Sequence, residues 1–253
     1  KVIKSDIVIS GAGVHITYKN LIPQESKPKI KHIDEALNMP QSFGHLSLYI
    51  GLKHTAEELN LPKANYWIYP NGTDHDKAIA DFLEDYNNEF PVVYISFPAA
   101  KNPKFEEKYP GRSTIEIITV AKYDWFKEWE TTKWKKRGEE YDILKEKLAQ
   151  RLLEHLYTYE PQLKGKIDLY ELSTPITTKH FCNYINGEIY GLDHPPERFT
   201  KEFLKPQTPI KNLFLTGQDI VTVGIGGALM SGVLTASAIT KSNLISEIVK
   251  GAK

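Results

Sequence analysis

A short stretch near the carboxyl end combines an acidic side chain with closely spaced glycines. Asp219 follows the apolar run 213–215, and Gly224, Gly226 and Gly227 come shortly after it. This pattern predicts a strand, a glycine-bearing turn and then a helix. The first N–H groups of a helix have no intrahelical partner, and the helix dipole makes that end partly positive, so an anion or an electron-rich ring can approach the backbone.

The same glycines can instead serve packing alone. Ala228, Ser231, Gly232 and Thr235 recur three or four residues apart and form a face of small residues. The spacing leaves both roles open. The carboxylate of Asp219 favours a ligand site, because it stands at the carboxyl end of a strand, where open α/β sheets bind ligands and where hydroxyl groups could donate to it.

Other side chains with ligand chemistry lack the spacing that a site requires. Residues 74–76, Asp-His-Asp, are consecutive, so they do not face one metal ion, and a solvated helix start is favoured. His180, Cys182 and His194 are types that zinc accepts, but they show no ligand spacing. No Gly-x-Ser-x-Gly elbow occurs. We therefore assign no metal site and no catalytic side chain.

Aromatic and basic residues alternate between residues 122 and 137. Such a segment is most often part of a core, and a membrane interface is the alternative. The aromatic residues are Tyr123, Trp125, Phe126, Trp129 and Trp134, and the basic ones are Lys122, Lys127, Lys133, Lys135, Lys136 and Arg137.

The composition narrows the class of protein. The 253 residues include 32 basic and 32 acidic side chains, so charge gives no case for a nucleic-acid partner. A hydrophobic content of 41% predicts a folded protein, and the single cysteine excludes an internal disulfide. No signal peptide and no long apolar run is present, which favours the cytoplasm or a membrane surface facing it. The chain starts at Lys1 without methionine, so we expect a piece of a longer protein.

The first segment resembles a dinucleotide fingerprint but does not complete it. Residues 6–10 predict a strand, and Gly11-Ala-Gly13 follows, yet the third glycine position holds Ile16. The helix after it can last only to about Pro23, and residues 24–40 are expected to form a polar loop. A complete βαβ unit needs strand, helix and strand in order.

The middle of the chain predicts a second, mainly antiparallel sheet. Its strands are expected at residues 45–50, 66–69, 91–97 and 114–120, with a further strand at 167–172. Helices are expected at 74–86, at 139–159 before Pro161, and from Gly226 to about Ile248. Residues 173–178 and 187–193 are expected to be loops and short strands. The chain thus leaves a first sheet, passes through a second and returns.

Several motifs together resemble a known family over residues 6–243. The sequence is similar to the carboxyl-terminal half of the carotenoid isomerase and all-trans-retinol 13,14-reductase (retinol saturase) group of phytoene desaturase-like flavoproteins. The motifs are residues 97–103, 109–114, 136–138, 216–219 and 226–229, with the tryptophans around Trp129.

The resemblance implies an α+β or α/β fold. Residues 1–23 and 206–253 would belong to a glutathione-reductase-like FAD domain, and residues 24–205 to an inserted substrate domain with a mainly antiparallel sheet and helices. Beside the ribityl and pyrophosphate groups of FAD would lie Gly217, Gln218 and Asp219. A helix start at the isoalloxazine edge would be formed by Gly224, Gly226, Gly227 and Ala228. The substrate tunnel or flavin face would be bordered by Tyr190, Gly191 and Asp193.

The chain departs from the family in one respect. Members begin with a Gly-x-Gly-x-x-Gly motif that this sequence lacks, so its FAD site is expected to be incomplete and the chain inactive without an amino-terminal dinucleotide-binding segment. The resemblance implies a saturase, desaturase or redox-dependent isomerase of a polyene such as a carotenoid or retinoid. The alternative is a non-catalytic module that binds an apolar ligand or a partner. Peripheral membrane contact is a further expectation.

Overall fold

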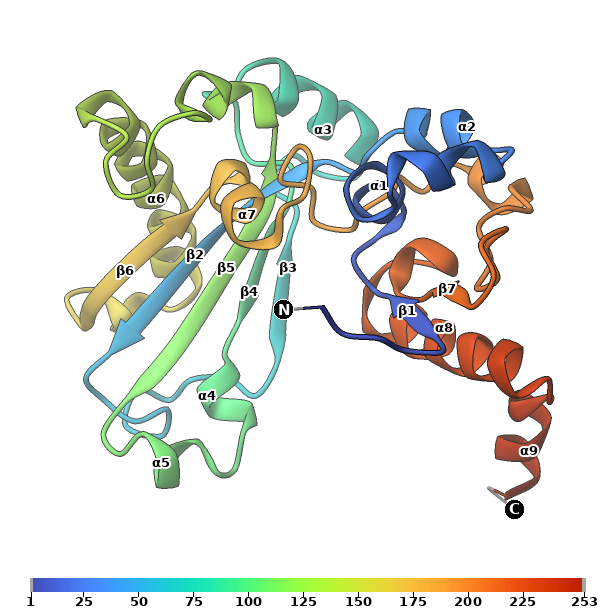
Figure 1. Ribbon diagram of the computed structural model, residues 1–253. Coiled ribbons are helices and arrows are strands. Elements are labelled where there is room, and N and C mark those ends of the chain that lie inside the picture. Colours follow the sequence, from blue (N-terminus) through green and yellow to red (C-terminus); the bar gives the residue numbers. More distant parts are fainter. Residues whose placement is uncertain (1, 252–253) are drawn as a thin grey trace. The chain divides into compact units, whose positions relative to one another are not determined.

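The computed structural model describes residues 2–251, except the side chains of Pro28 and Lys29, and it has an α+β arrangement (Figure 1). The strands are β1 (Val8–Ser10), β2 (Gly44–Leu52), β3 (Asn65–Ile68), β4 (Val93–Ser96), β5 (Ser113–Ala121), β6 (Ile167–Ser173) and β7 (Leu213–Leu215). The α-helices are α1 (Val14–Ile16), α2 (Ile33–Asn38), α3 (His75–Glu84), α4 (Pro98–Lys101), α5 (Phe105–Lys108), α6 (Glu139–Tyr159), α7 (Pro175–Cys182), α8 (Gly224–Thr240) and α9 (Leu244–Gly251).

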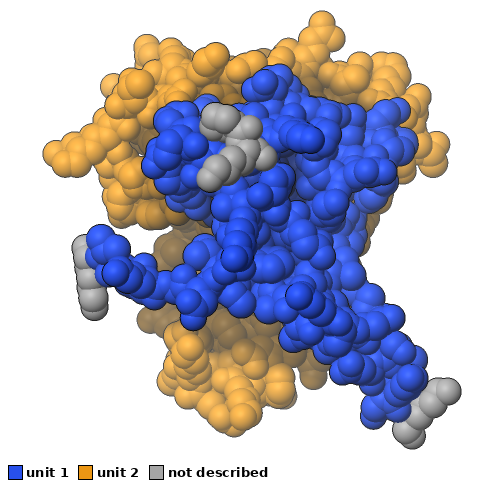
Figure 2. Space-filling model, turned by 45° about the vertical axis from the view of Figure 1, so that its right-hand side comes forward, with its two compact units in different colours: residues 1–42, 189–253 blue, residues 43–188 orange. Residues whose placement is uncertain are grey.

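The chain divides into two compact units, which Figure 2 colours separately. Unit 1 comprises residues 1–42 and 189–253, and unit 2 comprises residues 43–188. In unit 1 the first and last strands, β1 and β7, pair in parallel, with Val8 opposite Leu213. The expected return of the chain to its first sheet is therefore confirmed. The sequence predicted a cofactor domain of residues 1–23 and 206–253 and a substrate domain of residues 24–205. These functional roles stay predictions. Residues 1 and 252–253 lie outside the described part.

Unit 2 contains the predicted antiparallel sheet. Its five strands lie in the order β3-β4-β5-β2-β6, and every neighbouring pair is antiparallel. Alternation along β2 explains its two faces: Leu46, Leu48 and Ile50 are buried in the core, whereas Tyr49 between them is exposed. One face of the sheet therefore supplies the core of this unit, and the other carries mixed polar and aromatic side chains.

Helix α6 has the bounds that its apolar spacing predicts. Leu148, Leu152 and Leu156 are buried in the unit 2 core, and the next turn begins at Pro161. Three acidic residues in its first turn interact favourably with the helix dipole. Each fully buried leucine contributes about 1.5–3 kcal/mol to folding, so this face anchors the helix on the sheet.

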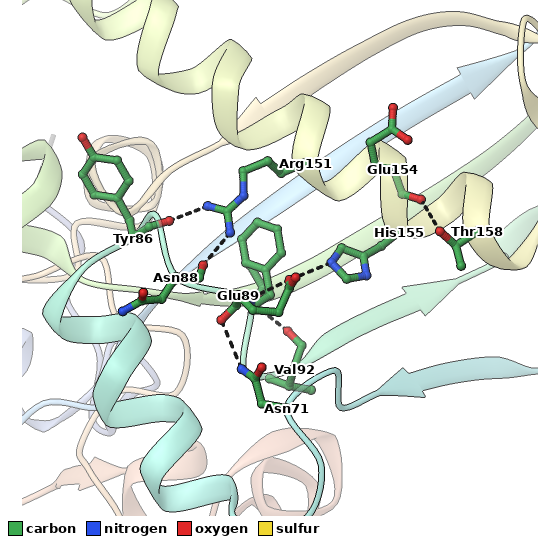
Figure 3. Close-up of polar contacts among 11 residues, drawn as sticks. Asn71, Tyr86, Asn88, Glu89, Val92, Arg151, Glu154, His155 and Thr158 are labelled. Atoms are coloured by element: carbon green, nitrogen blue, oxygen red, sulfur yellow. Dashed lines mark hydrogen bonds and ion pairs between the residues drawn. The ribbon is translucent and has the colours of Figure 1, made fainter.

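A polar cluster attaches α6 to the segment between α3 and β4 (Figure 3). The guanidinium of Arg151 donates to the carbonyls of Tyr86 and Asn88 and lies 4.4 Å from the centre of the Phe90 ring. One turn further, His155 Nε2 lies 3.0 Å from Glu89 Oε1. These contacts satisfy loop carbonyls that would otherwise lack partners, which is a structural role.

Two predicted loops are helical instead. Residues 173–178 were expected to be loop or short strand, but α7 starts at Pro175 because Thr174 and Thr177 cap its first turn reciprocally. Residues 24–40 contain a 3-10 helix, Gln24–Lys29, and α2, which buries Ala36. Both predictions were wrong because capping and burial outweighed the local polarity.

The predicted helix from Gly226 to about Ile248 is also two helices. Helix α8 begins at Gly224 and ends at Thr240, where Lys241 adopts a left-handed conformation with φ of 55°. Helix α9 then starts at Leu244. The side chain of Asn243 accepts a hydrogen bond from the Ser246 N–H, which satisfies one donor of its first turn.

The aromatic segment lies mainly in the core of unit 2. Residues Tyr123–Trp129 form a 3-10 helix in which Phe126 is fully buried, and Trp125 and Trp129 pack against the same core. The core interpretation is thus confirmed for these residues, whereas Trp134 is exposed. No helix within residues 2–251 is long and apolar enough to cross a membrane.

Candidate functional site

Asp219 is a buried carboxylate that joins three segments of unit 1. It follows β7 in the 3-10 turn Gln218–Ile220. Its Oδ2 accepts from the Val14 N–H at 2.8 Å and its Oδ1 from the Leu192 N–H at 3.0 Å. Gly191 has φ of 69°, and a Cβ there would collide with Oδ1, so only glycine allows this approach. The carboxylate thereby fixes the positions of all three segments.

Arg198 makes a second connection between the same segments. Its side chain is 2% exposed. Nη1 donates to the carbonyls of Leu192 at 2.8 Å and Asp193 at 3.1 Å, and Nη2 donates to the carbonyls of Gln218 and Asp219, both at 2.9 Å. Burial lowers the pKa of Arg198, and the charge of Asp219 opposes that change. No pattern in the sequence indicated this residue, because an arginine in a proline-rich loop is ordinarily expected in solvent.

His194 presents a buried ring nitrogen beside this junction. Its Nδ1 lies 3.3 Å from Nη1 of Arg198. Its Nε2 is buried without a hydrogen-bond partner among the described residues. Burial, and then the charge of Arg198, lower the pKa of His194 and favour the neutral ring. A polar atom of a ligand could satisfy this nitrogen.

The glycines at the start of α8 differ in what surrounds them. A Cβ on Gly227 would lie 2.6 Å from the carbonyl carbon of Thr222 and closer still to its oxygen, so this glycine is needed for packing. A Cβ on Gly224 or Gly226 would meet no atom within 4 Å. Ile225 beside them is 90% exposed. The backbone at this helix start can therefore be approached from outside.

Small side chains attach α8 to β7. The hydroxyl of Ser231 accepts from the Gly217 N–H at 2.8 Å, and Thr235 Oγ1 donates to the Leu215 carbonyl at 3.0 Å. Both hydroxyls are buried. The face of small residues that the sequence predicted therefore packs on the strand, and it leaves the opposite face, with Leu229 at 72% exposure, open.

The mixed face of the unit 2 sheet carries a row of polar side chains. Tyr49 lies opposite Glu116 on β5, and Ser96 on β4 lies opposite the same glutamate. Burial raises the pKa of Glu116, and it also raises the pKa of Tyr49, with Glu116 adding to that effect. A shallow hollow of about 330 Å³ includes Tyr49, Glu116 and the apolar Leu169. The hollow could hold an apolar group and hydrogen-bond a hydroxyl.

The comparisons with known proteins identify the family. No protein-family model matches the chain. It is 38% identical over 99% of its length to an all-trans-retinol 13,14-reductase of Danio rerio and 37% identical over 96% to that of Rattus norvegicus. The chain belongs to the all-trans-retinol 13,14-reductase group. It spans about two fifths of the length of these relatives, 42% and 41%.

The resemblance found in the sequence is thus confirmed at the level of this group. One relative, 32% identical over 94% of the chain, is named an inactive all-trans-retinol 13,14-reductase of Danio rerio. Membership of the all-trans-retinol 13,14-reductase group therefore does not by itself establish activity.

The site residues predicted for this reductase-group chain lie together in unit 1. Gly191 contacts Asp219, the Tyr190 N–H donates to Ser42 Oγ at 3.0 Å, and the Asp193 N–H donates to the Pro40 carbonyl at 2.9 Å. The Gly224 N–H reaches Gln218 Oε1 at 3.4 Å. The predicted cofactor residues are Gly217, Gln218, Asp219, Gly224, Gly226, Gly227 and Ala228, and the predicted substrate residues are Tyr190, Gly191 and Asp193. Their roles toward a ligand stay predictions.

His45, on β2 of the reductase-group chain, should make the stability of unit 2 depend on pH. Burial lowers its pKa to about 4, whereas an unfolded histidine titrates near about 6.5. The stability that neutral His45 contributes is complete above the pKa of histidine in the unfolded chain. It is lost as the pH falls toward the pKa of His45 in the folded protein. We expect the free energy of unfolding to fall by about 2 kcal/mol between about pH 8 and pH 5. The substitution His45→Leu should abolish this pH dependence.

Urea unfolding followed by tryptophan fluorescence measures this loss. All four tryptophans lie in unit 2, so the fluorescence reports on the unfolding of that unit. His54→Leu, on the surface of the same unit, is the matched control. An equal pH dependence in His45→Leu and the unsubstituted chain would contradict the prediction. In the described part of the chain, no three His, Cys, Asp or Glu side chains are placed to hold a metal ion.

Proposed function

We propose that this chain is the carboxyl-terminal part of a FAD-dependent oxidoreductase that acts on a polyene lipid, a retinoid in the first instance. The names of the relatives support a reductase of all-trans-retinol over desaturation or isomerisation. The observation that carries the proposal is the open start of α8 beside the Asp219 junction. Bound FAD would supply the hydride chemistry. We place the protein in the cytoplasm or on a membrane surface facing it.

The residues of unit 1 fit such a cofactor. Gly224 and Gly226 leave space for a ring or phosphate to approach the first turn of the helix, whose partial positive charge stabilises negative charge on a bound ligand. Ser231 and Asp219 hold the turn that precedes the helix. His194 Nε2 offers one buried nitrogen that has no hydrogen-bond partner among the described residues. The site is incomplete in this chain, and the proposed partner is an amino-terminal dinucleotide-binding segment.

The mixed face of the unit 2 sheet is a suitable place for an apolar substrate with one hydroxyl. Leu169 provides apolar contact in the hollow, and Glu116 with Tyr49 provides hydrogen-bonding groups. The carboxylate of Glu116 can accept a hydrogen bond from a hydroxyl. Tyr190, Gly191 and Asp193 remain proposed as border residues of the substrate or flavin site.

A non-catalytic module that binds an apolar ligand is the second candidate. The hollow on the mixed face favours it, because that feature requires no cofactor. This candidate predicts that the chain binds a polyene in the absence of flavin.

The gene product, expressed with any upstream segment, distinguishes the two candidates. We expect it to carry flavin absorbance and, with a supplied reductant, to remove absorbance from all-trans-retinol as a double bond is saturated. A product that folds and binds retinol but contains no flavin after reconstitution would leave only the binding module. Glu116→Gln, which keeps the size of the side chain, should weaken retinol binding under either candidate.

A further inference from the structure

Three aromatic rings from separate parts of unit 2 form one exposed cluster. Trp134 follows the 3-10 helix, and His180 and Phe181 lie near the end of α7. The rings of Trp134 and His180 stack at 5.8 Å with an interplanar angle of 12°, and Phe181 packs edge-on against Trp134 at 5.2 Å. Trp134 is 39% exposed and Phe181 62% exposed. Side chains this apolar are costly to leave in water, which points to contact with another phase or molecule.

Basic side chains surround this cluster. Lys133, Lys135 and Lys136 are all exposed, and Lys135 Nζ lies 4.8 Å from the centre of the Trp134 ring. Within residues 2–251 no carboxylate lies within ion-pair distance of these lysines. Along the chain the nearest acidic residues are Glu130, which forms an ion pair with Lys179, and Glu139, which begins α6. The lysines therefore keep their charge available to an anionic partner.

Arg137 holds the aromatic and basic residues in place. Its buried guanidinium donates to the carbonyls of Trp129 at 3.4 Å and Ile176 at 3.5 Å, and it lies 5.2 Å from the centre of the Tyr141 ring. One arginine thus connects the segment of Trp134 with helix α7. A surface that is ordered in advance loses less entropy on binding.

We propose that this basic aromatic surface, formed by Trp134, His180, Phe181 and the three lysines, docks the protein on an anionic phospholipid bilayer. Tryptophan and phenylalanine partition into the boundary between headgroups and acyl chains, and lysines beside them are attracted by anionic headgroups. The net charge of the whole chain is zero, so this attraction is local to the surface. The docking is separate from the proposed oxidoreductase function and requires no cofactor.

Co-sedimentation with phosphatidylserine-containing vesicles, and with pure phosphatidylcholine vesicles, tests the proposal on the 253-residue chain. We expect binding to the anionic vesicles that weakens with salt and is accompanied by a blue shift of tryptophan fluorescence. Replacing all three lysines by glutamine should lower the partition coefficient more than about tenfold, from the contribution of each cation near a charged surface. Trp134→Ser with Phe181→Ser should lower it comparably.

Matched variants separate this surface from other exposed groups. Trp67→Ser removes another exposed tryptophan of unit 2, and Lys104→Gln with Lys108→Gln removes exposed lysines elsewhere; both should bind as the unsubstituted chain does. Circular dichroism checks that each variant is folded. Binding that is lost in Ile225→Ser with Leu229→Ser, but kept in the lysine variant, would assign membrane contact to α8 and overturn the proposal. Lysine-dependent binding to RNA or an acidic protein without vesicle binding would also overturn it.

Discussion

Replacing Asp219 by asparagine should destabilise unit 1 by about 3–5 kcal/mol, the cost typical of breaking a buried charged network. Asparagine has one carbonyl oxygen, so either the Val14 or the Leu192 N–H would face an NH₂ group and lose its acceptor. The guanidinium of Arg198 would also lose the nearby negative charge that favours its protonated form. Arg198→Lys should have a similar effect, because an ammonium cannot reach four carbonyls with the geometry of a planar fork.

Hydrogen exchange of the individual segments measures this effect. Protection should fall around residues 14, 192 and 219, while tryptophan fluorescence, which reports only on unit 2, should change little. Glu197→Gln, beside Arg198 but exposed, is the matched control and should keep protection unchanged. Equal protection in Asp219→Asn and Glu197→Gln would mean that the carboxylate does not connect the segments.

Two neighbouring alanine substitutions should separate the packing role of the α8 glycines from their ligand role. Gly227→Ala forces a methyl group against the backbone of Thr222, so we expect a destabilisation of about 3 kcal/mol whether or not a ligand binds. Gly226→Ala places its methyl group in open space and should stabilise the helix by about 0.5–1 kcal/mol. If a cofactor approaches this backbone, Gly226→Ala should nevertheless weaken FAD binding at least about tenfold, a cost of about 1.4 kcal/mol.

Flavin titration of the gene product that includes any upstream segment supplies the affinity, and urea unfolding of the same protein supplies the stability. Gly232→Ala, later in α8 and also facing open space, is the control for the methyl group itself. Unchanged FAD affinity in a stable Gly226→Ala protein would restrict the glycines to packing. That result would leave the membership of the reductase group intact.

Part of this fold follows from local patterns in the sequence. The apolar spacing of α6 predicted its bounds, and alternation predicted the antiparallel strands of unit 2. The glycines at the start of α8 predicted a turn into a helix, although not the break at Lys241. These features were accessible because burial on one side of a helix or strand imposes a period on the residues that form it.

The candidate site was predicted only in part. The sequence and its family resemblance indicated the residues around Asp219 and Gly226, but nothing local indicated that Arg198 would be buried beside them. The cluster of Trp134 with Phe181 was equally hidden, because α7 itself was not predicted. Capping by Thr174, with Pro175 at the first helical position, was the signal that could have revealed this helix.

The sequence by itself determined the periodic elements, the absence of a charge excess and the glycine-rich helix start. Only the tertiary structure decided what the polar groups contact: Asp219 accepts from Val14, 205 residues away, and Arg198 satisfies carbonyls from two separate segments. The physical reason is that a buried polar group must find partners wherever the folded chain places them. Such partners follow from the packing of distant segments, and they leave no period or spacing in the sequence.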